Sequence, residues 1–303
     1  MKSSNIGGQA VTEGVMMRNA DKYAVAVRKT DGEIVVKTEE YKGIVQNKKI
    51  RSLPIIRGVF SFIDSMVLGM STLTYSASFF MDEEEEEKDE KKESVMMGLT
   101  IACSVVMAVA IFMILPYFLS QLFRKFTDST TLITLLEGAV RLVIFFGYIL
   151  LISRMKDIQR VFMYHGAEHK CINCIEHGME LNVENVLKSS RLHKRCGTSF
   201  LFIVMIVSII FFLFIRIESP IWRVVFRLLL IPVIAGVSFE FIRLAGKSEN
   251  KLVILLSKPG MMLQKLTTRE PDASMAEVAI ASAEAGFDWR AYLKENFGWQ
   301  DKG

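Results

Sequence analysis

The sequence predicts a mainly α-helical membrane protein with about four transmembrane helices and one amphipathic helix, together with a small N-terminal β-hairpin element and a cytoplasmic metal-site-like loop. The first observation is composition, since 51% of the 303 residues are hydrophobic. The second is that apolar runs of about 20 residues recur along the chain, which is the length that crosses a bilayer as a helix. The third is a stretch rich in His, Cys and Glu between two of these runs.

The N-terminal segment, 1–52, is polar and mixed in composition, so we expect it to lie outside the membrane without a signal peptide. Within it, "YAVAVRKTDGEIVVK" contains two alternating apolar and polar runs around Asp31-Gly32. Glycine supplies the positive φ that a tight turn needs, so this stretch predicts a β-hairpin. The earlier "GGQAVTEGVMMR" is punctuated by glycines, which permit close backbone approach to a ligand or another segment, and we interpret the stretch as a turn in preference to such a contact.

The next segment, 53–81, is apolar but contains Arg57 and Asp64. These two residues are seven positions apart and therefore share one face of a helix. The pattern indicates an amphipathic helix at the membrane surface or against the bundle, with a true transmembrane span as the alternative. The segment 82–94 consists of acidic and basic residues with one serine at its end and contains no hydrophobic side chain, which predicts a solvated linker.

Four further apolar runs predict the transmembrane helices. They form two pairs, within 95–153 and 198–244, and cover about 95–122, 132–153, 198–217 and 221–244. Ionisable residues lie inside them. Glu137 and Arg141 are four apart and can pair on one helix face, and Arg227 and Glu240 fall in the last run. We interpret these charges as contacts that fix helix packing.

Basic residues predict the orientation. Eight of them lie between the second and third spans: Arg154, Lys156, Arg160, Lys170, Lys188, Arg191, Lys194 and Arg195. The positive-inside rule places this loop, 154–197, in the cytoplasm of a cell-membrane protein, and both termini follow, including the tail 245–303. That tail contains a Ser274-x-x-Glu277 capping box before a predicted soluble helix. The net charge of +4 is too small to indicate a nucleic-acid partner.

The loop carries the residues that bind metals. His165 and His169 are four apart, so on a helix they project from one face and can bind one Zn²⁺. Glu168 between them completes the pattern H-x-x-E-H, the inverted zincin order, in which the glutamate serves as general base. Gly166 weakens this helix by about 1 kcal/mol.

A second cluster, His193 and Cys196, precedes the third span, and two ligand sets remain open. One set is His165, His169, His193 and Cys196. The other is Cys171, Cys174, His193 and Cys196, whose spacing suits a closed structural zinc site. A cytoplasmic location keeps thiols reduced, which favours metal binding over a disulfide in either case.

Several motifs in one order resemble the YqhQ family, bacterial multi-pass membrane proteins described as predicted metal-dependent enzymes. The motifs are "GGQAVTEGVMMR", "YHGAEHKCIN", "VENV", "RLHKRCGTSF" and "KPGMMLQKLTTREP". The resemblance covers almost the whole chain and marks His165, Glu168, His169, Glu176, His193, Arg195 and Cys196. Cys171 and Cys174 lie outside the family pattern, and Lys194 stands where proline is common.

The resemblance therefore favours the histidine-rich ligand set, with Glu176 as a further ligand and Glu168 and Arg195 as catalytic residues. It also implies that Glu13, Arg18 and Arg269 converge on the loop. Two functions remain open. One is a zinc-dependent hydrolase that acts on a membrane-associated peptide or lipid. The other is a non-enzymatic protein that zinc stabilises and that binds protein partners in membrane-protein assembly or biogenesis.

Overall fold

The computed structural model describes residues 2–80, 90–215, 217, 219–247 and 250–300. Most of the predicted acidic linker lies outside the described residues, and helix α3 begins at Glu90. The chain divides into two compact units. The sheet unit comprises Met1–Phe80, Ser153–Ile203 and Ala235–Gly303, and the bundle unit comprises Met81–Ile152 and Val204–Ile234.

The sheet unit is built on a four-stranded antiparallel sheet in the order β1-β2-β3-β4. Its strands are β1 (Ile6–Val11), β2 (Gly14–Asn19), β3 (Lys22–Arg28) and β4 (Ile34–Glu40). The predicted hairpin is confirmed as β3 and β4, with Gly32 at φ +89° in the turn. The interpretation of "GGQAVTEGVMMR" as a turn is wrong, because this stretch forms the β1–β2 hairpin. Its alternation is hard to recognise because glycine and alanine occupy several strand positions.

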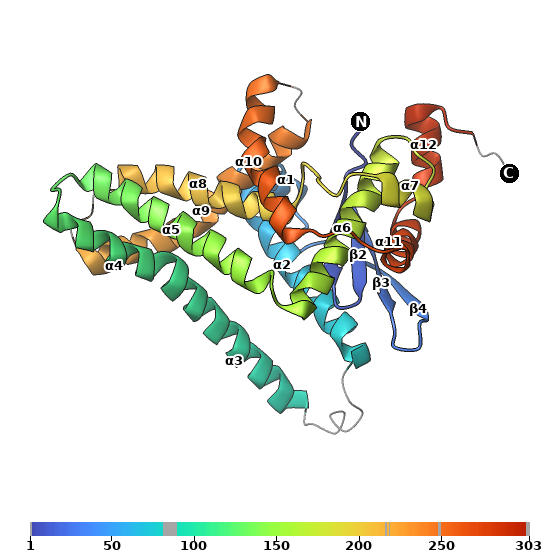
Figure 1. Ribbon diagram of the computed structural model, residues 1–303, viewed down its shortest axis with the longest axis horizontal. Helices are drawn as coiled ribbons and strands as arrows, with labels where there is room; N and C mark the ends of the chain where they lie inside the picture. The colour runs from blue at the N-terminus through green and yellow to red at the C-terminus, as the bar shows by residue number, and fades with distance from the viewer. Residues whose placement is uncertain (1, 81–89, 216, 218, 248–249, 301–303) are drawn as a thin grey trace. The chain divides into compact units, whose positions relative to one another are not determined.

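Both faces of this sheet are covered by helices (Figure 1). Helices α6 (Lys156–Glu176) and α11 (Ala273–Gly286) pack on one face, and α2 (Ile56–Ala77) packs on the other. Side chains alternate across a strand, so the two faces have different cores. The first core includes Val15, Met17, Ala26, Tyr164, Ala167, Cys171, Ala279 and Ala283. The second includes Val11, Met16, Tyr23, Val25, Val27 and Leu68.

The remaining helices of the sheet unit are short or follow the last apolar run. They are α1 (Lys48–Ser52), α7 (Val183–Lys188), α10 (Lys251–Thr267) and α12 (Trp289–Phe297). The predicted capping box at Ser274 is displaced by two residues. Asp272 is the N-cap of α11, since its Oδ1 accepts a hydrogen bond from the Met275 N–H at 2.9 Å.

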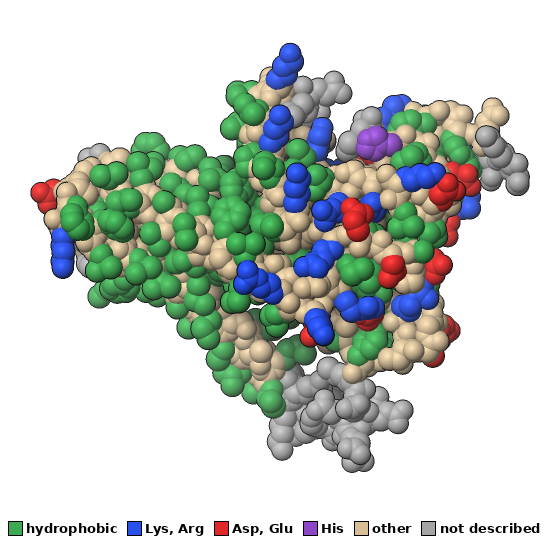
Figure 2. Space-filling view, viewed as in Figure 1, with side chains coloured by type: hydrophobic (Ala, Val, Ile, Leu, Met, Phe, Trp, Pro, Cys, Tyr) green, Lys and Arg blue, Asp and Glu red, His purple; other side chains and the backbone are tan. Residues whose placement is uncertain are grey.

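The bundle unit contains α3 (Glu90–Val109), a π-helical turn (Ala110–Ile114), α4 (Leu115–Gln121) and α5 (Thr130–Ile152), with parts of α8 (Gly197–Phe214) and α9 (Pro220–Lys247). On the face shown in Figure 2, the bundle helices carry mostly hydrophobic side chains, whereas charged side chains gather over the sheet unit. A lipid-facing surface has this composition, because hydrocarbon cannot solvate polar groups.

Five described helices are long and apolar enough to cross a membrane. They are Ile56–Phe80, Val95–Lys125, Thr130–Ile152, Gly197–Phe214 and Ile221–Gly246, so the chain is a multi-pass membrane protein. Four agree with the predicted spans, and the fifth is the segment that we expected to be amphipathic. Its charges do not form one solvated face. Arg57 pairs with Glu240, and the buried Asp64 accepts a hydrogen bond from the Ile44 N–H.

The helix that carries the histidines is separate from the second span. Helix α5 ends at Ile152 and α6 begins at Lys156. The structure also shows that much of the segment 154–197 is helical, through α6 and α7, rather than loop.

Candidate metal centre

Three metal-binding side chains come together in the sheet unit. His165 and His169 lie one turn apart on α6, and Cys196 directly precedes α8. One donor atom from each lies within 4.8 Å of the other two, and His165 Nε2 is 3.3 Å from Cys196 Sγ. Tetrahedral zinc with ordinary bond lengths separates a nitrogen and a sulfur ligand by about 3.5 Å. The donor set and its spacing therefore fit a zinc ion.

Backbone carbonyls orient both imidazoles. His165 Nδ1 lies 2.9 Å from the Thr267 carbonyl oxygen, and His169 Nδ1 lies 2.7 Å from that of Arg191. A carbonyl can only accept, so each Nδ1 donates a hydrogen bond to it, and Nε2 is the nitrogen that remains to bind a metal. This arrangement fixes the tautomer of metal-binding histidines in proteins.

Two polar residues of α6 hold the chain that leads to Cys196. The Lys170 ammonium donates to the carbonyls of Leu187 and Ser189, both at 2.8 Å. The Asn173 amide donates to the carbonyls of Ser190 and Leu192, at 2.6 and 3.0 Å. These bonds satisfy the carbonyls of an irregular segment, which would otherwise cost free energy when buried. They also bring Cys196 to the histidine face of α6.

Gly166 allows a second segment to approach α6. A Cβ atom at this position would lie 2.0 Å from the Arg269 carbonyl oxygen. The Arg269 N–H donates to the Phe162 carbonyl at 2.8 Å. The chain after α10 is thereby held against α6, which brings the Thr267 carbonyl to His165. The glycine that weakens the helix is the residue that permits this contact.

The thiol and the imidazoles form a coupled charge pair. Burial alone would raise the pKa of Cys196, but His165 and His169 lower it well below its ordinary value. Burial would lower the pKa of His165, and the neighbouring Cys196 outweighs it and raises that pKa to about 9. The site therefore favours a thiolate, which is the form of cysteine that binds metals.

Glu168 lies beside this group with an unused oxygen. Glu168 is 4% exposed, and its Oε2 has no hydrogen-bond partner among the described residues. Burial raises the pKa of this carboxyl, against the opposing effect of His169 and His165. Gly8 of β1 makes room for it, because a Cβ there would lie 2.8 Å from Glu168 Oε1. A buried carboxylate oxygen without a partner indicates that a ligand belongs there.

Glu176 is fully engaged by other groups. Its Oε1 accepts from the N–H and the hydroxyl of Ser4, both at 2.8 Å, and pairs with Arg195. Its Oε2 lies 3.4 Å from His193 Nε2. Burial opposes ionisation, but His193 and Arg195 lower the pKa of Glu176 to about 2.

This second cluster, Ser4, Glu176, His193 and Arg195, adjoins the metal-binding group. The rings of His169 and His193 are 5.8 Å apart. Burial lowers the pKa of His193 despite the nearby Glu176. Among the described residues, the group with metal-binding geometry is confined to His165, His169 and Cys196. The structure thus separates the predicted ligands His193 and Glu176, and the predicted catalytic Arg195, from the other three.

The alternative cysteine set does not come together. Cys171 and Cys174 are buried in the core between α6 and α11. Cys171 Sγ lies 3.7 Å from the Ala279 carbonyl oxygen, and Cys174 Sγ lies 3.4 Å from that of Glu180. Burial raises the pKa of both thiols. They point away from the face that carries His165 and His169, as expected for positions offset on a helix.

Two of the three residues that the resemblance links to this region contact α6 or the chain before it. Glu13 pairs with Arg160 and accepts from the Tyr164 hydroxyl at 3.3 Å. Arg269 donates to the Ser153 carbonyl at 3.0 Å. Arg18 instead donates to the carbonyls of Ala20 and Tyr41 near the sheet.

Sequence reasoning missed the residues that support the site. Asn173 had a detectable signal, because it lies eight positions after His165 and four after His169, on the same helix face. Ser4, Lys170 and Gln264 had none. Gln264 fixes His193 through its backbone, accepting from the N–H at 2.9 Å and donating to the carbonyl at 2.7 Å. Contacts to backbone carbonyls leave no spacing pattern in the sequence.

Comparisons with known proteins place the chain in a family. The family described as "Protein of unknown function (DUF1385)" matches residues 53–289. The chain belongs to the DUF1385 family. It is 37% identical over 287 residues to the "Uncharacterized protein YqhQ" of Bacillus subtilis (strain 168), covering 91% of this chain and 90% of that protein. The predicted YqhQ resemblance is therefore confirmed. No solved structure matches the chain.

The DUF1385 match includes the whole candidate centre, since His165, Glu168, His169 and Cys196 all lie within 53–289. It begins after the four strands of the sheet. The similarity to YqhQ extends further and covers most of the chain. Neither comparison brings a reaction, so function is argued from the site.

Proposed function

We propose that this multi-pass membrane protein binds one zinc ion through His165, His169 and Cys196 and hydrolyses a membrane-associated peptide or lipid. The observation that carries the proposal is the combination of three converging ligands with an unpaired buried carboxylate at Glu168. Structural zinc sites are closed by four protein ligands, whereas catalytic sites have three and leave one position open. The described residues provide three.

Different residues of the chain have different roles in the proposed reaction. The carbonyls of Thr267 and Arg191 engage Nδ1 of the two imidazoles, so that Nε2 is the nitrogen that binds the metal. Glu168 accepts and returns a proton as general base, because its Oε2 is unpaired and burial raises its affinity for protons. When bound, zinc supplies a Lewis acid that activates water and polarises a carbonyl or phosphoryl oxygen. Arg195, paired with Glu176, acts as a positioning residue rather than a catalytic one.

The predicted orientation indicates on which side of the membrane the centre lies. A crossing by α2 would put the strands and α6 on opposite sides of the membrane although they pack together, so we place α2 against the sheet and count four crossings. Four crossings keep the sheet unit and both termini on one side, and the basic segment between α5 and α8 supports the cytoplasmic side. A hydrolytic centre at that position has access to substrates at the inner membrane surface. Labelling of single engineered cysteines at exposed sheet-unit positions such as Lys37 in intact cells tests this. Protection from an impermeant thiol reagent supports the orientation, and labelling without cell lysis contradicts it.

A second candidate is a structural zinc that stabilises a partner-binding protein. The observation in its favour is that the three ligands and their carbonyl partners join α6, the segment before α8 and the chain after α10. A metal at this junction would hold three segments together without any reaction. It requires a fourth ligand, and Glu168 would then be bound to the metal rather than free.

The test compares wild type with Glu168→Gln. Zinc-loaded protein is assayed against a panel of model peptides, esters and phosphodiesters, and zinc content and unfolding midpoint are measured in parallel. We expect Glu168→Gln to retain zinc and fold while hydrolysis falls by about 100-fold or more. Glu284→Gln, a carboxylate away from the centre, serves as the matched control. Equal hydrolysis by wild type and Glu168→Gln, or loss of zinc from the latter, would contradict the proposed role of Glu168 as base.

A further inference from the structure

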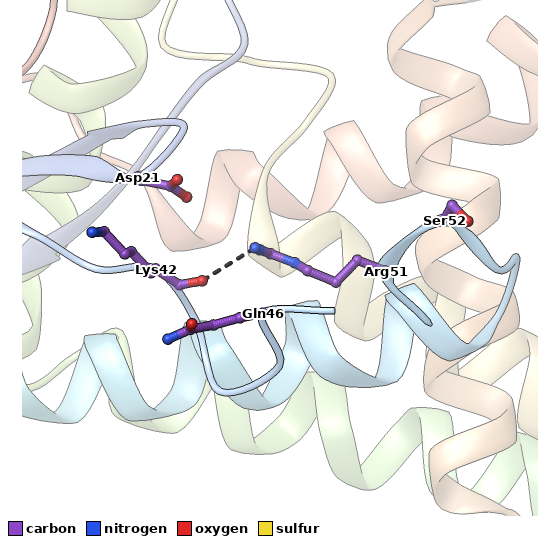
Figure 3. A pocket seen from close by; sticks show the side chains of 5 residues that line it. All are labelled: Asp21, Lys42, Gln46, Arg51 and Ser52. Carbon is purple, nitrogen blue, oxygen red and sulfur yellow. Dashed lines mark hydrogen bonds between the residues drawn. The ribbon is translucent and has the colours of Figure 1, made fainter. Parts of the chain in front are cut away.

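A polar pocket lies in the sheet unit, away from the candidate metal centre (Figure 3). Its volume is about 410 Å³, and it is lined by Asp21, Lys42, Gln46, Arg51 and Ser52. These residues come from the β2–β3 turn, the chain after β4, and α1. None of them takes part in the proposed hydrolytic reaction. In the close view, the Arg51 side chain extends toward Lys42 and Asp21.

A buried carboxylate shapes the chain that forms this pocket. Asp64 of α2 is 3% exposed, and its Oδ1 accepts from the Ile44 N–H at 2.8 Å and the Tyr41 hydroxyl at 3.2 Å. Gly43 has φ +79°, and a Cβ there would lie 2.6 Å from Asp64 Oδ2. The segment 41–44 is thus wrapped closely around Asp64. The backbone that presents Lys42 has a defined conformation.

The two basic side chains leave donors available to a ligand. Arg51 uses Nη1 to donate to the Lys42 carbonyl at 3.1 Å, and its Nη2 is 3.9 Å from Asp64. The Lys42 ammonium is 3.7 Å from the exposed Glu40, which is a weak contact. With Asp21, the lining residues carry two positive charges and one negative charge. A net charge of +1 complements a singly charged phosphodiester, which guanidinium and ammonium groups bind well.

Exposed aliphatic side chains lie in the same stretch of chain as the residues that line the pocket. Ile44, Ile50, Leu53, Ile55 and Ile56 are between 37% and 55% exposed. They share this stretch of chain with Lys49 and Arg51, and the membrane-length helix α2 begins at Ile56. Basic residues mixed with exposed aliphatic ones next to a membrane helix are typical of a segment that lies in the lipid headgroup region.

From these observations we infer that the pocket binds the phosphodiester headgroup of an anionic phospholipid. Lys42 and Arg51 contact the phosphate, and Asp21 accepts a hydrogen bond from a headgroup hydroxyl. The neighbouring isoleucines and Leu53 contact the acyl chains. A nucleic-acid phosphodiester fits less well, because a bound strand needs aromatic side chains or a basic track beyond the pocket, and the exposed hydrophobic residues of this stretch are aliphatic.

Native mass spectrometry of the full chain in nonionic detergent tests the inference, with phosphatidylglycerol as the probe. We expect Lys42→Ala to weaken phosphatidylglycerol binding about fivefold, the contribution of one basic residue at an anionic lipid surface. Lys42 suits the test because its side chain makes no buried contact. Lys49→Ala is the matched control, since it removes one positive charge from α1 without lining the pocket, and it should weaken binding less than twofold.

Two further measurements identify the ligand. Phosphatidylcholine should bind at least fivefold more weakly than phosphatidylglycerol, and millimolar inorganic phosphate should not displace the lipid. Equal effects of Lys42→Ala and Lys49→Ala would overturn the inference, because binding would then follow overall charge. Equal binding of the two lipids would overturn recognition of a negative headgroup. Displacement by inorganic phosphate would show that the pocket is a site for free phosphate rather than lipid.

Discussion

Two buried glutamates on different helices have opposite surroundings. Glu137 of α5, in the bundle unit, is held by two arginines. Arg227 binds both of its oxygens, at 2.5 and 2.9 Å, and Arg141 binds Oε1 at 2.9 Å. Glu168 of α6, in the sheet unit, has an oxygen with no partner among the described residues. Both oxygens of Glu137 are therefore paired within the protein, whereas Glu168 Oε2 is not.

This difference indicates that Glu137 has a packing role and that Glu168 has a chemical one. A charge inside a membrane bundle is tolerated when it is paired, and removal of one partner leaves the others uncompensated. The Glu137 cluster also includes Ser208, which accepts from Arg141 at 2.9 Å, and the Phe212 ring, 4.6 Å from the Arg227 guanidinium. It joins α5, α8 and α9. Glu168 Oε2, by contrast, has no hydrogen-bond partner among the described residues, which fits a group that acts on a ligand.

The largest effect is expected from Glu137→Gln. This change leaves two buried guanidinium groups without a counter-charge and should lower the free energy of unfolding by about 3–5 kcal/mol. The measurement is the unfolding transition of the full chain in detergent. Ser208→Ala is the control, because it removes two hydrogen bonds, one from Arg141 and one to the Met205 carbonyl, but no charge, and should cost only about 1–2 kcal/mol. Equal costs for the two variants would mean that Glu137 does not organise the bundle.

A smaller effect, dependent on pH, is expected at Glu176. Because its folded pKa is about 2 and its ordinary value is 4.5, the carboxylate stabilises the fold above pH 4.5. This contribution, about 3 kcal/mol, is lost as pH falls from 4.5 toward 2. Glu176→Gln should therefore be less stable than wild type at pH 7, and the difference should shrink in acid. A difference that is the same at pH 7 and pH 3 would contradict the assignment.

The smallest effect on stability is expected from Glu168→Gln. An unpaired buried carboxylate contributes no hydrogen bond at Oε2, so the isosteric amide should change the free energy of unfolding by about 1 kcal/mol or less. Comparison with Glu176→Gln, on the same helix, is the sharpest form of this test. A Glu168→Gln cost as large as that of Glu176→Gln would show that Glu168 is a structural residue.

The candidate site was partly predictable because helical spacing is a property of sequence. His165 and His169 are four residues apart and therefore share one face of a helix, and the structure confirms that they lie together on α6. Cys196 was a candidate from its position before an apolar run. The choice between the two ligand sets was not accessible from spacing alone. It depends on how α6 rotates its faces between α11 and the segment before α8, and only packing decides that.

The sequence predicted the fold least well in two places, the glycine-rich hairpin and the ion pairs between helices. The β1–β2 hairpin is rich in glycine, and its strands alternate too weakly to be recognised. The partner of Glu240 is Arg57, which is distant in the chain, and the partner of Arg227 is Glu137. Residues that pair across helices leave no local pattern. The membrane helices were predictable because length and hydrophobicity are local properties.

Metal content tests the central claim most directly. Elemental analysis should be made on detergent-purified wild type, His169→Ala and Cys174→Ala. The account predicts one zinc per chain in wild type and in Cys174→Ala, and loss of zinc from His169→Ala. Wild type without stoichiometric metal would contradict the candidate centre, and loss of zinc from Cys174→Ala would contradict its ligand set.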